Sequence, residues 1–180
     1  TLAIPEKVTE IGSYAFRKCT GLQSVSFPSS LRTIGESSFY GDTSLKNLII
    51  PEGVTVIDGY AFKSCTNVQD IALPETLQKI GDSAFYGMDG ISLIEIPANV
   101  TSVGGYAFSR CYNLSTVVFT GNAPAFGAGA FSNVRADVYY PSGNATWTTD
   151  VRQNYGGTLR WFNDTEVASV ETADAGTSVE

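Results

Sequence analysis

The sequence predicts a solenoid, in which one short coil of chain is repeated and stacked into an elongated array. Two columns of residues indicate it, each with an interval of 23 residues: proline at 5, 28, 51, 74 and 97, and phenylalanine at 16, 39, 62, 85, 108 and 131. A fixed period in the twenties is typical of solenoids. Because one coil cannot bury its own apolar side, successive coils must stack and share a core.

Each coil contains a strand that ends at the proline. In the segment LQSVSFP (22–28), apolar Val25 and Phe27 alternate with Ser24 and Ser26, a pattern that predicts an extended strand with one inward face. Proline cannot donate to a β ladder, so it lies just beyond the strand. The segment VTEIG (8–12) predicts a second short extended piece, and SYAFRKC (13–19) is compatible with one helical or 3₁₀ turn.

The repeated unit reads Pro-x-x-Val-x-x-Ile-Gly-x-x-Ala-Phe-x-x-Cys-x-x-Leu-x-x-Val-x-Phe over residues 2–141. It resembles the BspA-like subfamily of leucine-rich repeats, which is found in bacterial surface proteins and some protists. Proline stands where ordinary leucine-rich repeats carry asparagine, a departure typical of the subfamily. The resemblance implies a right-handed superhelix, mainly β with short helical turns. It also implies a parallel concave sheet of about seven strands from Leu-x-x-Val-x-Phe and a convex side from the Ala-Phe turns.

The predicted organisation has three parts: an array over 1–141 with a truncated first coil, a C-terminal cap over 142–162, and an acidic flexible tail or linker over 163–180. The cap is expected to contain one helix, with Asn144 as its N-cap, Gly156 as its stop, and Trp147, Val151 and Tyr155 on one face. The segment TLRWF (158–162) is compatible with a last extended segment.

A finer repeat of 46 residues is superimposed on the coils. Tyrosine and serine alternate at 14, 37, 60, 83 and 106, and Tyr40 and Tyr86 occur only in the even coils. A tyrosine can lean over a small neighbour in the next coil, which would give the alternation a packing reason. Recent duplication of a two-coil block explains it equally well, and the sequence leaves both explanations open.

Composition excludes several classes of function. The net charge is −7, of which the tail carries −5, so residues 1–162 are nearly neutral and form no nucleic-acid footprint. No run approaches the roughly 20 apolar residues of a membrane helix. The chain has no histidine, which removes His-dependent zinc sites and Ser-His-acid triads. We therefore expect no catalytic activity, no cofactor, no metal site and no membrane insertion.

Two residue types in the column Cys19, Asp42, Cys65, Met88 and Cys111 need an interpretation. Cysteines two coils apart would be about 10 Å distant, beyond the reach of a disulfide, so we expect free thiols that act as small buried hydrophobes. Asp42 is either a lone buried carboxylate with a function or, in the simpler interpretation, a turn residue that caps local N–H groups.

The outward positions of the predicted strands form the candidate binding face, since solenoids of this kind dock partners on the concave side. It consists of two ladders: Ser24, Asn47, Asp70, Leu93, Thr116 and Asp137; and Ser26, Ile49, Ala72, Glu95, Val118 and Tyr139. No Trp or Arg anchors either ladder, which favours a weak or multivalent contact.

The leading hypothesis is a non-catalytic interaction or adhesion module of a secreted or cell-surface bacterial protein, expected to be a monomer with an unknown protein or glycan partner. The extracellular location rests on the family resemblance. The alternatives are a structural spacer in a longer surface protein and a glycan-binding accessory domain.

Overall fold

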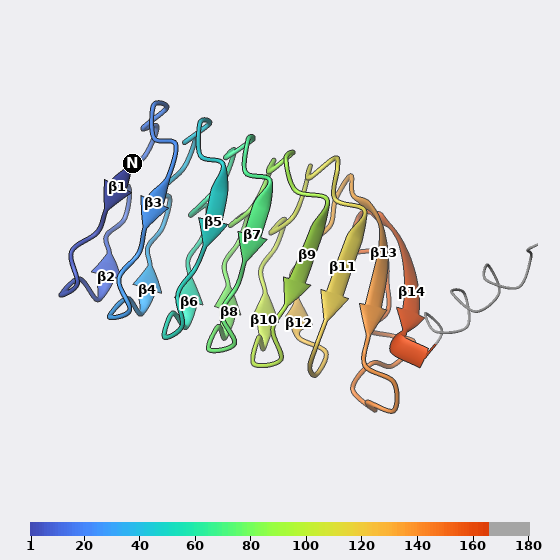
Figure 1. Ribbon diagram of the computed structural model, residues 1–180. Coiled ribbons are helices and arrows are strands. Elements are labelled where there is room, and N and C mark those ends of the chain that lie inside the picture. Colours follow the sequence, from blue (N-terminus) through green and yellow to red (C-terminus); the bar gives the residue numbers. More distant parts are fainter. Residues whose placement is uncertain (166–180) are drawn as a thin grey trace, which may run out of the picture.

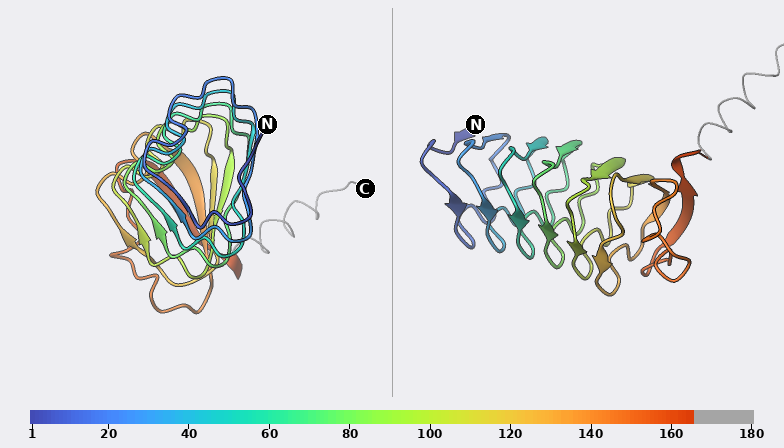
Figure 2. Two further views of the ribbon diagram at one scale, coloured as in Figure 1. Left: turned by 90° about the vertical axis from the view of Figure 1, so that its left-hand side faces the viewer. Right: turned by 90° about the horizontal axis from the view of Figure 1, so that it is seen from below.

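The computed structural model describes residues 1–165 and forms a parallel β-solenoid of about seven turns (Figure 1). Viewed along the array, the coils overlay one another (Figure 2). Paired strands join residues that are 23 positions apart along most of the molecule, as in Leu2 with Val25 and Glu10 with Thr33. The predicted fold class and its period are confirmed.

The first row of strands comes from the Leu-x-x-Val-x-Phe segments and lengthens toward the C-terminal end. All of its pairs are parallel, in three sheets ordered β1-β3, β5-β7 and β14-β13-β11-β9. Its members are β1 (Leu2–Ala3), β3 (Val25–Ser26), β5 (Asn47–Ile49), β7 (Asp70–Ala72), β9 (Leu93–Ile96), β11 (Thr116–Phe119), β13 (Arg135–Tyr140) and β14 (Thr158–Asn163).

The second row forms one continuous six-stranded parallel sheet, as the VTEIG columns predict. Each strand has only two residues, of which one is fully or partly buried and points into the core. The strands are β2 (Glu10–Ile11), β4 (Thr33–Ile34), β6 (Val56–Ile57), β8 (Lys79–Ile80), β10 (Ser102–Val103) and β12 (Ala125–Phe126). Two thin sheets thus enclose one core along the array.

The Ala-Phe turns close each coil, and they differ from the predicted helical or 3₁₀ turn. Backbone N–H groups alternate between bonds within the turn, such as Arg17 N to Tyr14 O (3.1 Å), and bonds to the next coil, such as Phe16 N to Ser38 O (2.7 Å). Two backbone positions per turn have positive φ, as at Tyr14 (61°) and Lys18 (58°). Left-handed residues interrupt a right-handed helix, so the segment becomes a series of tight turns.

The core is a stack of six phenylalanine rings. Their centroids are 5.2, 5.3, 5.9, 5.4 and 5.4 Å apart from Phe16 to Phe131, with interplanar angles of at most 21°. The five rings from Phe39 onward are fully buried, whereas Phe16 in the first coil is partly exposed. Residues of both strand rows pack around this stack, so each coil completes the core of its neighbours.

The predicted cap helix over 144–156 is wrong, because that segment consists of turns and irregular chain. The spacing of Trp147, Val151 and Tyr155 reflects separate packing contacts. Trp147 lies 4.8 Å from the Phe119 ring, and Tyr155 lies 4.4 Å from the Phe126 ring. The predicted last extended segment is confirmed as β14, which pairs with β13 at an interval of 23 residues.

Residues 142–163 therefore form one further coil whose backbone keeps the period after the sequence pattern has faded. The sixth coil is two residues shorter, since β11 and β13 pair Thr116 with Asp137. The structure does not test the division into array, cap and tail, and most of the predicted tail (166–180) lies outside the described residues. No helix within the described residues is long and apolar enough to cross a membrane.

The 46-residue alternation has a packing reason. A Cβ added to Gly129 would lie 2.7 Å from Cε1 of Tyr106, so this tyrosine leans over the small residue one coil further on. In the same column Ser37 and Ser83 are buried, whereas Tyr14, Tyr60 and Tyr106 are exposed. Large and small side chains thus alternate where two adjacent tyrosines would crowd.

Candidate interaction surface

The structure brings the twelve predicted face residues together in two ladders. Strand register pairs Asn47 with Asp70 and Ile49 with Ala72 in one part of the row. In another it pairs Leu93 with Thr116 and Thr116 with Asp137. None of the twelve side chains is buried. The predicted placement is therefore confirmed, while a binding role for these residues stays a prediction.

Two aliphatic side chains stand out on this face. Ile49 is 69% exposed and Leu93 is 52% exposed, although both belong to residue types that are usually buried. Their exposure follows from the two-residue period of a strand: Leu48 and Ile94 point into the core, so their neighbours Ile49 and Leu93 must point outward. The face therefore has apolar side chains next to the carboxylates of Asp70 and Glu95.

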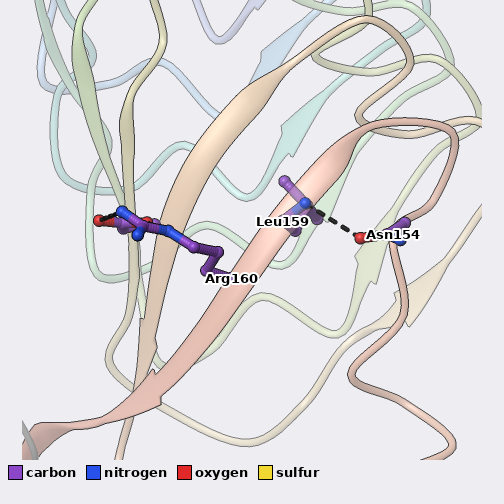
Figure 3. Close-up of polar contacts among 4 residues, drawn as sticks. Asn154, Leu159 and Arg160 are labelled. Carbon is purple, nitrogen blue, oxygen red and sulfur yellow. Dashed lines mark hydrogen bonds and ion pairs between the residues drawn. The ribbon is translucent and has the colours of Figure 1, made fainter.

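Strand β14 extends both ladders by one residue, and sequence reasoning missed these positions. Arg160 lies beside Asp137 and donates to its carboxylate from Nε to Oδ1 and from Nη2 to Oδ2, both at 2.6 Å (Figure 3). The hydrogen bond to Asp137 raises the pKa of the Arg160 guanidinium above its ordinary value. The Phe162 ring lies 5.6 Å from the Tyr139 ring. The sequence argument that no Arg anchors the face is thus wrong at its C-terminal end.

The loop before β14 holds that strand in place. The amide oxygen of Asn154 accepts a hydrogen bond from the backbone N–H of Leu159 at 3.0 Å (Figure 3). The indole Nε1 of Trp147 donates to the carbonyl of Gly121 at 2.9 Å, which fixes the loop to the preceding coil. The 23-residue interval from Asp137 was the signal that would have placed Arg160 on the face.

The three cysteines are free, and their burial depends on the coil they occupy. Cys65 and Cys111 are buried, and each Sγ donates to a phenylalanine carbonyl, of Phe39 and Phe85 respectively, at 3.2 Å. Burial raises the pKa of both thiols to about 12. Cys19 in the first coil is exposed, so the expectation that all three act as buried hydrophobes is wrong for this one.

Asp42 is fully buried, and the simpler interpretation of it as a local turn cap is wrong. Its Oδ1 accepts from the backbone N–H of Cys19 in the preceding coil at 2.7 Å, and its Oδ2 has no hydrogen-bond partner among the described residues. Burial raises the pKa of Asp42 to about 6, against the lowering effect of the Cys19 hydrogen bond. The carboxyl therefore destabilises the fold when it is ionised.

Chemical groups that could support catalysis do not converge in the described part of the chain. Residues 1–165 contain no group of three or more Cys, Asp or Glu side chains arranged to hold a metal ion. The surface depressions are lined by side chains of successive coils, such as Glu36, Asp58 and Asp82 in the longest of them. Exposed in-register ladders on stacked parallel coils define a leucine-rich repeat solenoid.

Comparison with known proteins agrees with this class. The model of the BspA type leucine rich repeat region matches in six copies over residues 1–114 and 33–148. The chain belongs to this family. A search of curated proteins finds no match.

Among solved structures, a T. pallidum leucine-rich repeat protein is 24% identical, with a TM-score of 0.60 over 99% of this chain and 84% of that one. A Bacteroides ovatus leucine-rich repeat protein is 21% identical, with a TM-score of 0.47 over 89% and 60%. The pneumococcal vaccine antigen PcpA is 20% identical, with a TM-score of 0.46 over 89% and 35%. The first of these similarities supports the fold.

Proposed function

We propose that this chain is a non-catalytic interaction module that binds a protein partner through the face of its first strand row, on the surface of a bacterial cell. The carrying observation is the pair of exposed aliphatic side chains, Ile49 and Leu93, on a rigid sheet in exact register. Family membership supports a repeat-based interaction module, and the resemblance to bacterial surface proteins supports the extracellular location and an adhesive role.

The chemistry of the face suits a protein surface. Protein interfaces combine an apolar centre with a polar rim, and here Ile49 and Leu93 lie among Asn47, Asp70 and Glu95. The Arg160–Asp137 pair and the Phe162–Tyr139 stack add an arginine and aromatic rings at one end, residue types that often dominate binding energy. A pre-formed sheet also loses little conformational entropy when it binds.

Capture from membrane extracts of cultured host epithelial cells tests this proposal. Immobilised wild type is compared with the double variant Ile49→Ser and Leu93→Asn, which introduces residues that the chain already carries in those columns at Ser26 and Asn47. We expect particular host proteins to be enriched by wild type and lost with the variant.

The matched control is Gln78→Ser, an exposed position that directly precedes β8 in the second row. It should retain the captured proteins. Identical captures by wild type and the double variant would contradict the proposed face. The absence of any specific capture would favour a spacer that holds neighbouring domains apart.

A further inference from the structure

We propose a second binding surface, separate from the strand face: the row of Ala-Phe turns binds an acidic polysaccharide with one carboxylate per disaccharide. We call this row the tyrosine ridge, and it lies along the top of the array in Figure 1. It comprises residues 14–18, 37–41, 60–64, 83–87, 106–110 and 129–133.

The charge of the ridge is opposite to that of the rest of the chain. Its residues include Arg17, Lys18, Lys63 and Arg110 and no acidic residue, a net charge of +4. The rest of the chain has seven basic and 18 acidic residues, a net charge of −11. None of the four cations forms an ion pair with a carboxylate in the described part of the chain, where the ion pairs are Lys79–Asp58 and Arg160–Asp137. The partner that complements this surface is therefore anionic.

The cations and tyrosine rings alternate along the array. The Arg17 guanidinium lies 5.7 Å from the Tyr14 ring centroid and 5.1 Å from that of Tyr40. The Lys63 ammonium lies 5.9 Å from Tyr40 and 4.3 Å from Tyr86. These distances are within the range of cation–π attraction. Ring contacts thus hold long basic side chains in place, which reduces the entropy lost when they meet an anion.

The ladder continues into the fifth coil and repeats an exposed ring in each two-coil unit. The Arg110 guanidinium lies 5.6 Å from the Tyr86 ring, and Lys63 also lies 5.2 Å from the Tyr60 ring. Tyr14, Tyr60 and Tyr106 are 51%, 38% and 52% exposed. Each unit of 46 residues thus presents one exposed aromatic ring and one or two cations.

The spacing of these units selects the kind of polymer. Adjacent parallel strands are 4.7–4.9 Å apart, so two coils span about 10 Å. An extended polysaccharide with alternating sugars repeats its carboxylate after one disaccharide, a comparable length, and the apolar face of a pyranose ring stacks on an exposed tyrosine. Acidic side chains on one face of an extended peptide recur about every 7 Å, and a nucleic acid duplex carries one charge per about 1.7 Å. Neither of these matches the ridge.

The acidic side chains beside the ridge have partners of their own. Asp58 accepts from Lys79 Nζ at 3.4 Å, and Asp82 Oδ1 accepts from the backbone N–H of Gly105 at 2.6 Å. Glu36 is exposed in the same depression, which borders the ridge at Tyr60. This acidic border repels a polyanion from one flank, so the polymer has to follow the cations along the axis of the array.

Titration calorimetry with hyaluronan oligosaccharides of increasing length tests the proposal, because hyaluronan carries one carboxylate per disaccharide. We expect the affinity to rise with length until the oligosaccharide spans all three units, and to fall as salt screens the charges. Lys63→Ser should weaken binding by about three-fold, and the triple variant Arg17→Ser, Lys63→Ser and Arg110→Ser by on the order of 30-fold.

Tyr60→Ser examines the aromatic contribution, and it should weaken binding by a factor similar to that of Lys63→Ser. Both substitutions use residues that the chain already carries in those columns, at Ser83 and Ser109, so the fold is retained. Lys7→Ser is the matched control, because it removes one exposed positive charge at a turn remote from the ridge and should leave the affinity unchanged.

Three outcomes would overturn the proposal. They are absence of binding to hyaluronan of any length, tighter binding of polyglutamate than of hyaluronan, and binding of heparin or hyaluronan that responds to salt but is equal in Tyr60→Ser and wild type. Loss of glycan binding in the ridge variants with unchanged protein capture would keep the two surfaces separate. The strand-face proposal therefore stands or falls independently.

Discussion

The first and third coils have nearly the same sequence in their turns but different surroundings. YAFRKC at 14–19 and YAFKSC at 60–65 place the same residue types in the same columns. In the third coil Ala61, Phe62 and Cys65 are fully buried, whereas in the first coil Ala15 and Cys19 are exposed and Phe16 is only partly buried. The difference shows that burial in this fold comes from the neighbouring coils and not from the residues of one coil.

The largest expected effect is on the free energy of unfolding when a central ring is removed. Phe62→Ala should cost about 3–5 kcal/mol, because rings at 5.3 and 5.9 Å on either side cannot close the cavity. Phe16→Ala should cost about half as much or less, since that ring has one ring neighbour in its column and contact with solvent. Chemical denaturation of the two variants measures the difference. Equal losses would contradict the dependence on neighbouring coils.

The second coil allows the comparison to be sharpened with Asp42, which bonds to the first coil through Cys19 N. Asp42→Met copies the residue of the fourth coil, Met88, and should stabilise the fold by about 1–3 kcal/mol by removing a buried, half-satisfied carboxyl. Cys19 N keeps its bond to Phe16 O, so no donor is left unpaired. A destabilised Asp42→Met protein would contradict this account.

Asp42 also predicts a dependence of stability on pH. Its pKa is raised from 3.8 to about 6 in the folded state, so the folded chain binds the proton more tightly than the unfolded chain does. Stability is therefore higher below about pH 4 and falls as pH rises toward 6, by no more than about 3 kcal/mol. Asp42→Asn should remove this slope. The relevant quantity is the difference between wild type and Asp42→Asn over the pH range, because other carboxylates cancel in it.

The cysteine column offers a kinetic form of the same comparison. Cys19 should react with a thiol reagent at pH 8 at least about 100-fold faster than Cys65 and Cys111, because the thiolate is the nucleophile and burial raises the pKa of the other two to about 12. Mass spectrometry of peptides after timed labelling distinguishes the three sites. Equal labelling in the native protein, with equal rates after denaturation as the reference, would show that the coils open together.

The smallest effect is expected on the strand face. Ser24→Ala should change the free energy of unfolding by less than about 0.5 kcal/mol, because the Ser24 hydroxyl bonds only to Thr1 Oγ1 at the exposed end of the array. Denaturation under the conditions used for Phe62→Ala provides the scale. A loss comparable to that of Phe16→Ala would mean that the first coil depends on this polar contact.

Sequence columns predicted the regular part of the molecule because one physical requirement, the stacking of identical coils, fixes every column at once. They placed both strand rows, the phenylalanine stack and the twelve outward residues. They failed where the period survives only in the backbone. Trp147, Val151 and Tyr155 imitate a helical face, but each packs on a different part of the sixth coil or its own loop.

The candidate surfaces were predicted unevenly for a related reason. Arg160 and Phe162 lie on the strand face through β14, whose register no column announced. The tyrosine ridge was visible as an alternation of letters, but the contact between Lys63 and the rings of Tyr60 and Tyr86 requires the twist of adjacent coils. Asp42 was misjudged because a turn sequence usually lies at the surface, whereas here the turn faces the preceding coil.

The lean of Tyr106 over Gly129 has a consequence for how arrays of this kind change length. Recombination that inserts or deletes 46 residues joins each tyrosine to a small neighbour again, so the new array keeps its packing and the sequence of rings and cations on the ridge. A deletion of 23 residues instead places two tyrosines, or two serines, in adjacent coils. Viable length variants should therefore differ by even numbers of coils, and the two-coil block is the heritable unit of this solenoid.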